Sequence, residues 1–164
     1  MSSPKIFIRK VLVGIVLIAL AACATLFIKE SLDTQDPESA LPLIRVEYNG
    51  TPLTDVYRSG YEWSFFTTVE RRMPELSEAD LPLVPVEVMP QVPMKITFSK
   101  EPSVLKVQRA QGRYSTDFLE LTGEDPSSFL TPSSPGTYVY KVYAEWRARG
   151  YIQYYFVLQV RDVY

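Results

Sequence analysis

The sequence has 164 residues but contains no histidine and only one cysteine. Histidine is the commonest general base in enzymes and a leading metal ligand. Its absence excludes Ser-His-Asp and Cys-His catalysis and an ordinary zinc site. A single cysteine cannot form a disulfide within the chain. The composition therefore predicts a protein that is not an enzyme and that holds no metal or cofactor.

Acidic side chains are absent from the first 29 residues, where Lys5, Arg9 and Lys10 precede an apolar run over residues 11–28. A basic end followed by an apolar run is typical of an export signal or a membrane anchor. The remaining residues carry 13 basic and 19 acidic side chains, a net charge of −6. Because nucleic acid is bound by basic surfaces, this charge argues against a nucleic-acid partner.

The single cysteine lies inside the apolar run. Leu20-Ala21-Ala22-Cys23 resembles the lipobox of bacterial lipoproteins, in which small residues let the signal peptidase reach the cysteine that receives the lipid. This resemblance implies lipidation at Cys23. The alternative is an uncleaved signal anchor, because eighteen apolar residues are just long enough to span a bilayer. In both cases the basic flank stays inside, so the rest of the chain is expected on the extracytoplasmic side of the cell membrane.

The sequence predicts three segments: a signal peptide or transmembrane anchor over 1–28, a tether over 29–42 and one folded domain over 43–164. The tether is polar and acidic and contains two prolines, a composition typical of a short linker. A domain of about 120 residues is long enough to bury one core and too short for two.

Apolar and polar residues alternate with period two through the domain, which predicts strands rather than helices. The predicted strands are residues 44–48, 61–65, 94–98, 104–108, 138–146 and 152–160, with a further candidate over 114–121. Asn49-Gly50 is a strong signal for a hairpin turn. Residues 73–93 contain five prolines, which cannot donate to a sheet, so a loop with one helical turn over 77–80 is predicted there. Short strands separated by turns predict an all-β, antiparallel β-sandwich.

The last two strands are predicted to pair as a hairpin with their apolar residues on one face. A three-residue loop of Ala148-Arg149-Gly150, with Gly150 in the left-handed conformation, keeps the two apolar sets on the same side. This register places Trp146 opposite Ile152 on the inner face and Tyr143 opposite Tyr155 on the outer face.

Gly136-Thr137-Tyr138-Val139-Tyr140 resembles the start of strand F in immunoglobulin-like domains, where a G-x-Y-x-C run follows a turn. The resemblance implies an Ig-like β-sandwich of the kind found in bacterial extracytoplasmic modules. It also implies a tyrosine corner, in which the hydroxyl of Tyr138 bonds to the backbone just upstream. Tyr140 stands where the family has its cysteine, and Trp63 is the candidate for the buried core tryptophan.

Gly60-Tyr61-Glu62-Trp63 is also similar to the G-Y-x-W end of a loop in chagasin-type inhibitors of cysteine peptidases. In that family a preceding N-P-T-T segment enters the peptidase cleft, whereas this chain has Val56-Tyr57-Arg58-Ser59. The inhibitor function is therefore an alternative by analogy. The competing interpretation is that Tyr61 and Trp63 are core residues of a strand.

Six of the eleven tyrosines lie between residues 138 and 155. On the predicted register, Tyr143 and Tyr155 share the outer face and Tyr151 lies near the hairpin tip. Such a surface can stack on sugars or contact a protein, and it can equally be a structural aromatic pair or be covered by the proline-rich segment. The expected function is therefore a membrane-tethered binding or structural module whose partner is a protein or a cell-wall glycan.

Overall fold

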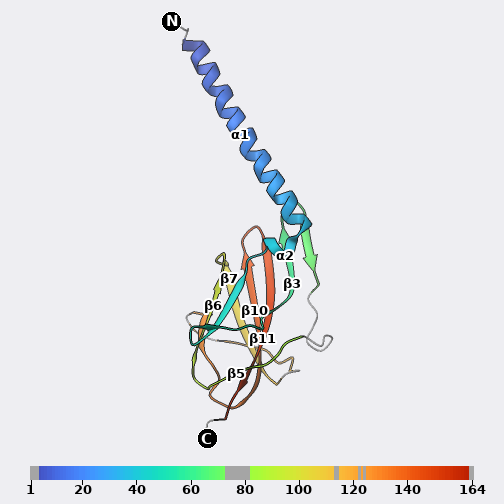
Figure 1. Cartoon of the computed structure of the whole chain (residues 1–164), viewed down its shortest axis with the longest axis vertical. Helices are drawn as coiled ribbons and strands as arrows, with labels where there is room; N and C mark the ends of the chain where they lie inside the picture. The colour runs from blue at the N-terminus through green and yellow to red at the C-terminus, as the bar shows by residue number, and fades with distance from the viewer. Residues whose placement is uncertain (1–3, 73–81, 113–114, 122, 124, 163–164) are drawn as a thin grey trace. The chain divides into compact units, whose positions relative to one another are not determined.

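The computed structural model describes residues 4–72, 82–112, 115–121, 123 and 125–162 (Figure 1). The chain forms two compact units. One consists of residues 1–41 together with 65–67, and the other of residues 42–64 and 68–164.

The first unit is dominated by helix α1 (Pro4–Gln35), which is followed by the short helix α2 (Pro37–Ala40). Within Ile8–Gln35 an 18-residue stretch has a mean hydropathy of 2.9, and none of it is buried. Helix α1 is therefore long and apolar enough to cross a membrane, as membrane anchors and signal sequences both are. It continues into the segment predicted as a tether and ends just before Pro37, because the residue preceding a proline is disfavoured in the helical conformation.

The second unit consists of strands joined by turns and loops. The strands are β1 (Ile44–Tyr48), β2 (Thr51–Pro52), β3 (Tyr57–Ser64), β4 (Thr68–Arg71), β5 (Val86–Val88), β6 (Pro93–Phe98), β7 (Val104–Gln111), β8 (Leu119–Glu120), β9 (Ser128–Leu130), β10 (Gly136–Trp146) and β11 (Gly150–Val160). One sheet has the order β2-β1-β6-β9, and the other has the order β4-β3-β11-β10-β7-β8 with β5 beside β11. All pairs are antiparallel except β5 with β11, so the prediction of a mainly antiparallel β domain is confirmed.

The smaller sheet begins with the predicted hairpin. In β1 the buried Val46 lies between Arg45 and Glu47, whose side chains pair at 2.7 Å on the outer side. Asn49 and Gly50 adopt φ values of 47° and 77°, the left-handed pair that a two-residue hairpin turn requires. Tyr48 therefore pairs with Thr51, and the predicted turn is confirmed.

Strands β10 and β11 lie inside the larger sheet and confirm the predicted C-terminal hairpin. The residues of both predicted apolar faces are at most 5% exposed: Tyr138, Tyr140, Val142, Ala144, Trp146, Ile152, Tyr154, Phe156, Leu158 and Val160. Period-two alternation thus predicts correctly which side of the hairpin faces the core.

The predicted register of this hairpin is wrong by two residues. Trp146 pairs with Gly150 rather than Ile152, and Tyr143 pairs with Gln153 rather than Tyr155. The turn closes earlier because the Arg149 amide donates to the Trp146 carbonyl (3.0 Å) and Ala148 takes a left-handed conformation (φ 58°); Gly150 also has a positive φ (131°), but it already pairs in the strand. Gly150 is needed inside the strand instead, where an added Cβ would overlap the backbone carbonyl of Glu62 on β3.

The two sheets share one interior that is lined by aromatic rings from both. The ring of Phe98 on β6 lies 5.6 Å from that of Trp146 and 6.2 Å from that of Tyr154. Phe129 on β9 stacks on Tyr140 at 5.5 Å. Removing these large rings from water is a main source of stability for a domain of this size.

The proline-rich segment is predicted to be a loop, but part of it forms a strand of the large sheet. Residues 73–81, and with them the predicted helical turn over 77–80, lie outside the described residues. Val86–Val88 forms β5, which runs parallel to the end of β11 and has no proline inside it. Just before β5, Leu83 is 5% exposed and packs on the outer face of the large sheet.

Candidate functional site

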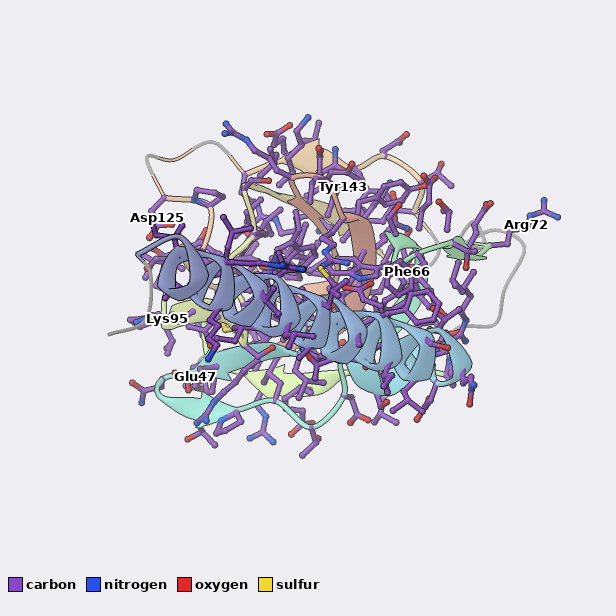
Figure 2. The ribbon with its side chains drawn as sticks, turned by 90° about the horizontal axis from the view of Figure 1, so that it is seen from above. Glu47, Phe66, Arg72, Lys95, Asp125 and Tyr143 are labelled. Atoms are coloured by element: carbon purple, nitrogen blue, oxygen red, sulfur yellow. The ribbon has the colours of Figure 1, made fainter. Side chains whose placement is uncertain are left out.

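Two of the three tyrosines predicted to form a binding surface come together on the outer face of the large sheet. The rings of Tyr143 on β10 and Tyr151 on β11 stack with their centroids 5.4 Å apart and their planes at 26°. Both side chains are half-buried, and Tyr143 is labelled in Figure 2. This pair is the part of the predicted surface that remains accessible.

Tyr155 lies on the outer face as predicted, but it is buried there, so the prediction that it belongs to an accessible binding surface is wrong. Tyr155 is 3% exposed and forms a buried cluster with Leu83, Val139 and Val157, against which Phe118 also packs. Its hydroxyl accepts a hydrogen bond of 2.8 Å from the side-chain amide of Gln153. Segments distant in sequence thus cover this half of the outer face, which agrees with the structural alternative.

Carboxylates surround the stacked tyrosine pair. Burial raises the pKa of Tyr143, and the negative charge of Glu145, which accepts a 3.4 Å hydrogen bond from the Tyr143 hydroxyl, raises it further. Burial also raises the pKa of Tyr151, with Glu62 and Glu70 as additional causes. These rings therefore stay neutral phenols that can stack and donate hydrogen bonds, and the surrounding charge disfavours anions.

Cys23, the residue predicted to carry a lipid, is exposed in the apolar part of α1. The hydroxyl of Thr25 donates to the carbonyl of Ala22 (2.8 Å), so this helical turn satisfies its own polar side chain. Lipidation at Cys23 and the uncleaved signal anchor both remain predictions.

The segment similar to chagasin-type inhibitors lies in strand β3. Gly60, Tyr61 and Glu62 pair with β11, and the side chains of Tyr61 and Trp63 are about 5% exposed or less. The two aromatics are thus core residues, as the competing interpretation predicted. Tyr57 also pairs with β11, so the preceding residues belong largely to a strand, and the inhibitor function stays a prediction by analogy.

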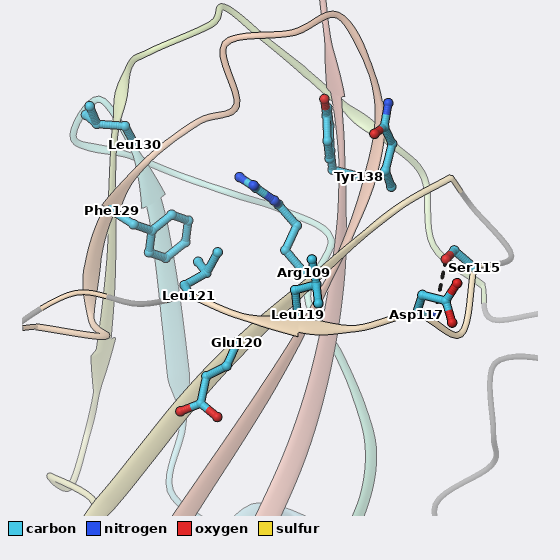
Figure 3. A pocket seen from close by; sticks show the side chains of 10 residues that line it. Arg109, Ser115, Asp117, Leu119, Glu120, Leu121, Phe129, Leu130 and Tyr138 are labelled. Carbon is cyan, nitrogen blue, oxygen red and sulfur yellow. Dashed lines mark hydrogen bonds between the residues drawn. The ribbon is translucent and has the colours of Figure 1, made fainter.

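A cavity that sequence reasoning missed opens between the two sheets beside Arg109 (Figure 3). Its volume is about 630 Å³, within the size range of small-molecule sites. The large sheet contributes Arg109 and Tyr138 to its lining, and β9 of the smaller sheet contributes Phe129 and Leu130. In Figure 3 Arg109 points between Phe129 and Tyr138.

Two tyrosine side chains, Tyr138 and Tyr140, lie next to the Arg109 guanidinium. The guanidinium lies 5.5 Å from the centre of the Tyr138 ring, and the Tyr138 hydroxyl donates to the carbonyl of Ser134 at 3.0 Å. The Tyr140 hydroxyl is buried and makes no hydrogen bond of good geometry with any residue that the structure describes. Burial raises the pKa of Tyr140 to about 12, although interaction with the nearby Arg109 opposes the rise.

The sequence contained a signal for this cavity. Leu105, Val107 and Arg109 occupy alternate positions of β7, so the arginine stands on the face that β7 turns toward the core. A charge that interrupts an apolar alternation needs a partner or access to water, because burying it alone is costly. The predicted strand ends at residue 108 and therefore does not include Arg109.

Among the described residues, no three cysteine, aspartate or glutamate side chains are grouped so that they could hold a metal ion. No protein-family model, no curated protein and no solved structure matches the chain. The function proposed for it therefore rests on its own residues and geometry.

Proposed function

We propose that this chain is a membrane-anchored, non-enzymatic binding module whose β domain lies on the extracytoplasmic side of a bacterial cell membrane. The observation that carries the proposal is α1, whose apolar stretch has a mean hydropathy of 2.9 and is entirely unburied. Exposing this apolar surface to water is unfavourable. Such a helix is therefore expected to lie in a membrane or to act as a signal peptide. The basic residues before the apolar run favour an inside N-terminus.

The proposal includes an Ig-like β-sandwich for the β domain. Its support is local: the Tyr138 hydroxyl donates to the carbonyl of Ser134, four residues upstream, as the implied tyrosine corner requires. Trp63, the candidate core tryptophan, is 4% exposed and packs edge-on against Trp146 at 5.4 Å. The two sheets facing a common aromatic core agree with this architecture.

Two surfaces of the β domain are suited to binding rather than to catalysis. The stacked Tyr143–Tyr151 pair presents ring faces of the kind that stack on sugars or contact proteins. The Arg109 cavity offers one cation in a lining that also holds two carboxylates and several apolar side chains. The partner in this proposal is a protein or a cell-wall glycan.

Membrane topology tests the proposal directly. In the full chain with Cys23→Ser, a new cysteine at the exposed Glu101 should react with a membrane-impermeant maleimide in intact spheroplasts. The matched control, Ser2→Cys in the same background, should react only after the cells are opened. Labelling of the control alone in intact spheroplasts would reverse the proposed orientation.

Fatty-acid labelling separates the two forms of anchor. A labelled lipid that is incorporated into the natural chain and lost with Cys23→Ser identifies a lipoprotein. A chain that remains in the membrane without incorporating the lipid identifies an uncleaved signal anchor.

A further inference from the structure

Arg109 faces the core beside two aromatic side chains, Tyr138 and Tyr140. It stands on the inward face of β7, pairs with Tyr140 on β10 and has Leu119 of β8 on its other side. Within the part of the chain that the structure describes, Arg109 forms no ion pair. Its capacity to donate several hydrogen bonds in one plane is therefore available to a ligand in the cavity.

The position of the guanidinium is set before any ligand arrives. The Tyr138 ring supports it at 5.5 Å, and that ring is itself held by its hydroxyl bond to Ser134. The buried Tyr140 hydroxyl lies close enough to interact with Arg109 and makes no hydrogen bond of good geometry with any described residue. A preorganised donor loses less conformational entropy on binding than a flexible surface lysine does.

The charges around the cavity favour a singly charged ligand. Asp117 and Glu120 also line the cavity, and Figure 3 shows the carboxylate of Glu120 pointing away from Arg109. These carboxylates would repel a dianion such as a phosphate monoester more strongly than a carboxylate. One arginine matches one planar carboxylate with two parallel hydrogen bonds.

Besides its charged residues, the cavity lining contains the polar Gln111 and Ser115 and, on one side, apolar side chains: Leu119, Leu121, Phe129 and Leu130. Leu119 and Leu130 are 75% and 50% exposed, and in Figure 3 Leu121 and Phe129 lie between Leu130 and Arg109. Apolar side chains this exposed gain stability when a ligand covers them. The ligand should therefore carry an apolar group next to its carboxylate.

We infer that the Arg109 cavity binds a monocarboxylate attached to an apolar group, the chemistry of a peptide ending in a free carboxyl group after hydrophobic residues. This inference rests on the proposed binding function and names the ligand class of one of its two candidate surfaces. In the bound state the carboxylate accepts two hydrogen bonds from Arg109, and the apolar group covers Leu119, Leu121 and Phe129.

A matched pair of probes tests the inference. The full chain in zwitterionic lipid nanodiscs is titrated with acetyl-Leu-Phe bearing a free carboxylate and with the same dipeptide as its amide, using empty nanodiscs as the blank. Two charge-assisted hydrogen bonds should make the amide bind roughly tenfold more weakly or worse. Amide resonances of β7, β8 and β9 should shift only with the carboxylate.

Variants of Arg109 complete the test. Arg109→Gln should weaken carboxylate binding roughly tenfold or more, to the level of the amide probe, and Arg109→Lys should retain part of the preference. The control Arg45→Gln, on the exposed face of β1, should bind like the natural chain. Circular dichroism checks that each variant is folded, and the comparison of the two probes on the natural chain needs no variant.

Equal binding of the carboxylate and the amide, or unchanged binding by folded Arg109→Gln, would overturn the inference. Neither result changes the maleimide labelling of Glu101→Cys, so the membrane-anchored module would stand without this ligand. Conversely, if the maleimide labelling is reversed but carboxylate binding is intact, the proposed extracytoplasmic location is wrong while the Arg109 binding site still stands.

Discussion

Near the β10–β11 turn, rings of Trp63, Trp146 and Phe98 fill the space between the two sheets, whereas at the opposite end the space beside Arg109 is open. Polar atoms at the filled end have partners: the indole of Trp146 donates to the carbonyl of Lys100 at 3.0 Å. At the open end the Tyr140 hydroxyl makes no well-formed bond. The filled end therefore stabilises the fold, while the open end is where we propose that a ligand binds.

Removing a ring from the filled end should have the largest effect. Trp146→Ala should lower the free energy of unfolding by about 3–5 kcal/mol, because it leaves a cavity against Trp63 and Phe98. Urea unfolding of the full chain in detergent, followed by circular dichroism, measures the loss. Leu119→Ala at the open end, where the side chain is 75% exposed, should change stability by no more than about 0.5 kcal/mol. Similar losses of unfolding free energy in the two variants would show that the filled end and the open end contribute equally to stability.

The ionisation of Tyr140 makes the open end sensitive to alkaline pH. Burial raises its pKa from 10.0 to about 12, so above pH 10 the unfolded chain loses this proton while the folded chain keeps it. The free energy of unfolding should therefore fall between pH 10 and pH 12, by roughly 2–3 kcal/mol from this group.

Tyr140→Phe isolates that contribution. Unfolding measured from about pH 9 to about pH 12 should show a shallower decline in the variant than in the natural chain, because the other tyrosines are common to both. Parallel curves would mean that Tyr140 does not titrate differently in the folded and unfolded states.

The smallest expected change in stability comes from removing single buried hydroxyl groups. The Tyr154 hydroxyl donates to the carbonyl of Pro42 at 3.0 Å, so Tyr154→Phe should cost about 1 kcal/mol. At neutral pH Tyr140→Phe should be neutral or slightly stabilising, since it removes a buried hydroxyl without a well-formed bond. Thermal unfolding under identical conditions ranks the two variants, and the opposite order would show that the Tyr140 hydroxyl is satisfied.

Local patterns in the sequence predict much of this fold. Alternation assigns Tyr140, Val142 and Phe156 to the inner face, and Asn49-Gly50 specifies its own turn, because both depend on neighbouring residues alone. The predicted register of the C-terminal hairpin is wrong because the turn closes at Ala148 (φ 58°), so that Gly150 (φ 131°) already pairs with Trp146. The choice depends on the close approach of Gly150 to Glu62, a contact between distant parts of the chain.

The same distinction applies to the candidate sites. Tyr143 and Tyr151 are neighbours within one hairpin, so their proximity could be predicted, but Tyr155 is covered by Leu83, more than seventy residues earlier in the chain. The cavity at Arg109 is formed by strands from both sheets. Spacing along one strand cannot specify how two sheets meet.

Strand β11 pairs with three strands that precede it in the chain: β3, β5 and β10. During synthesis, β3 and β5 are therefore made long before the residues that complete their hydrogen bonds. Until residues 150–160 arrive, the matching edges of β3 and β10 are open to pairing with other chains. We therefore expect the large sheet to assemble only after nearly the whole β domain has been made, and we expect pairing over such long sequence separations to slow folding.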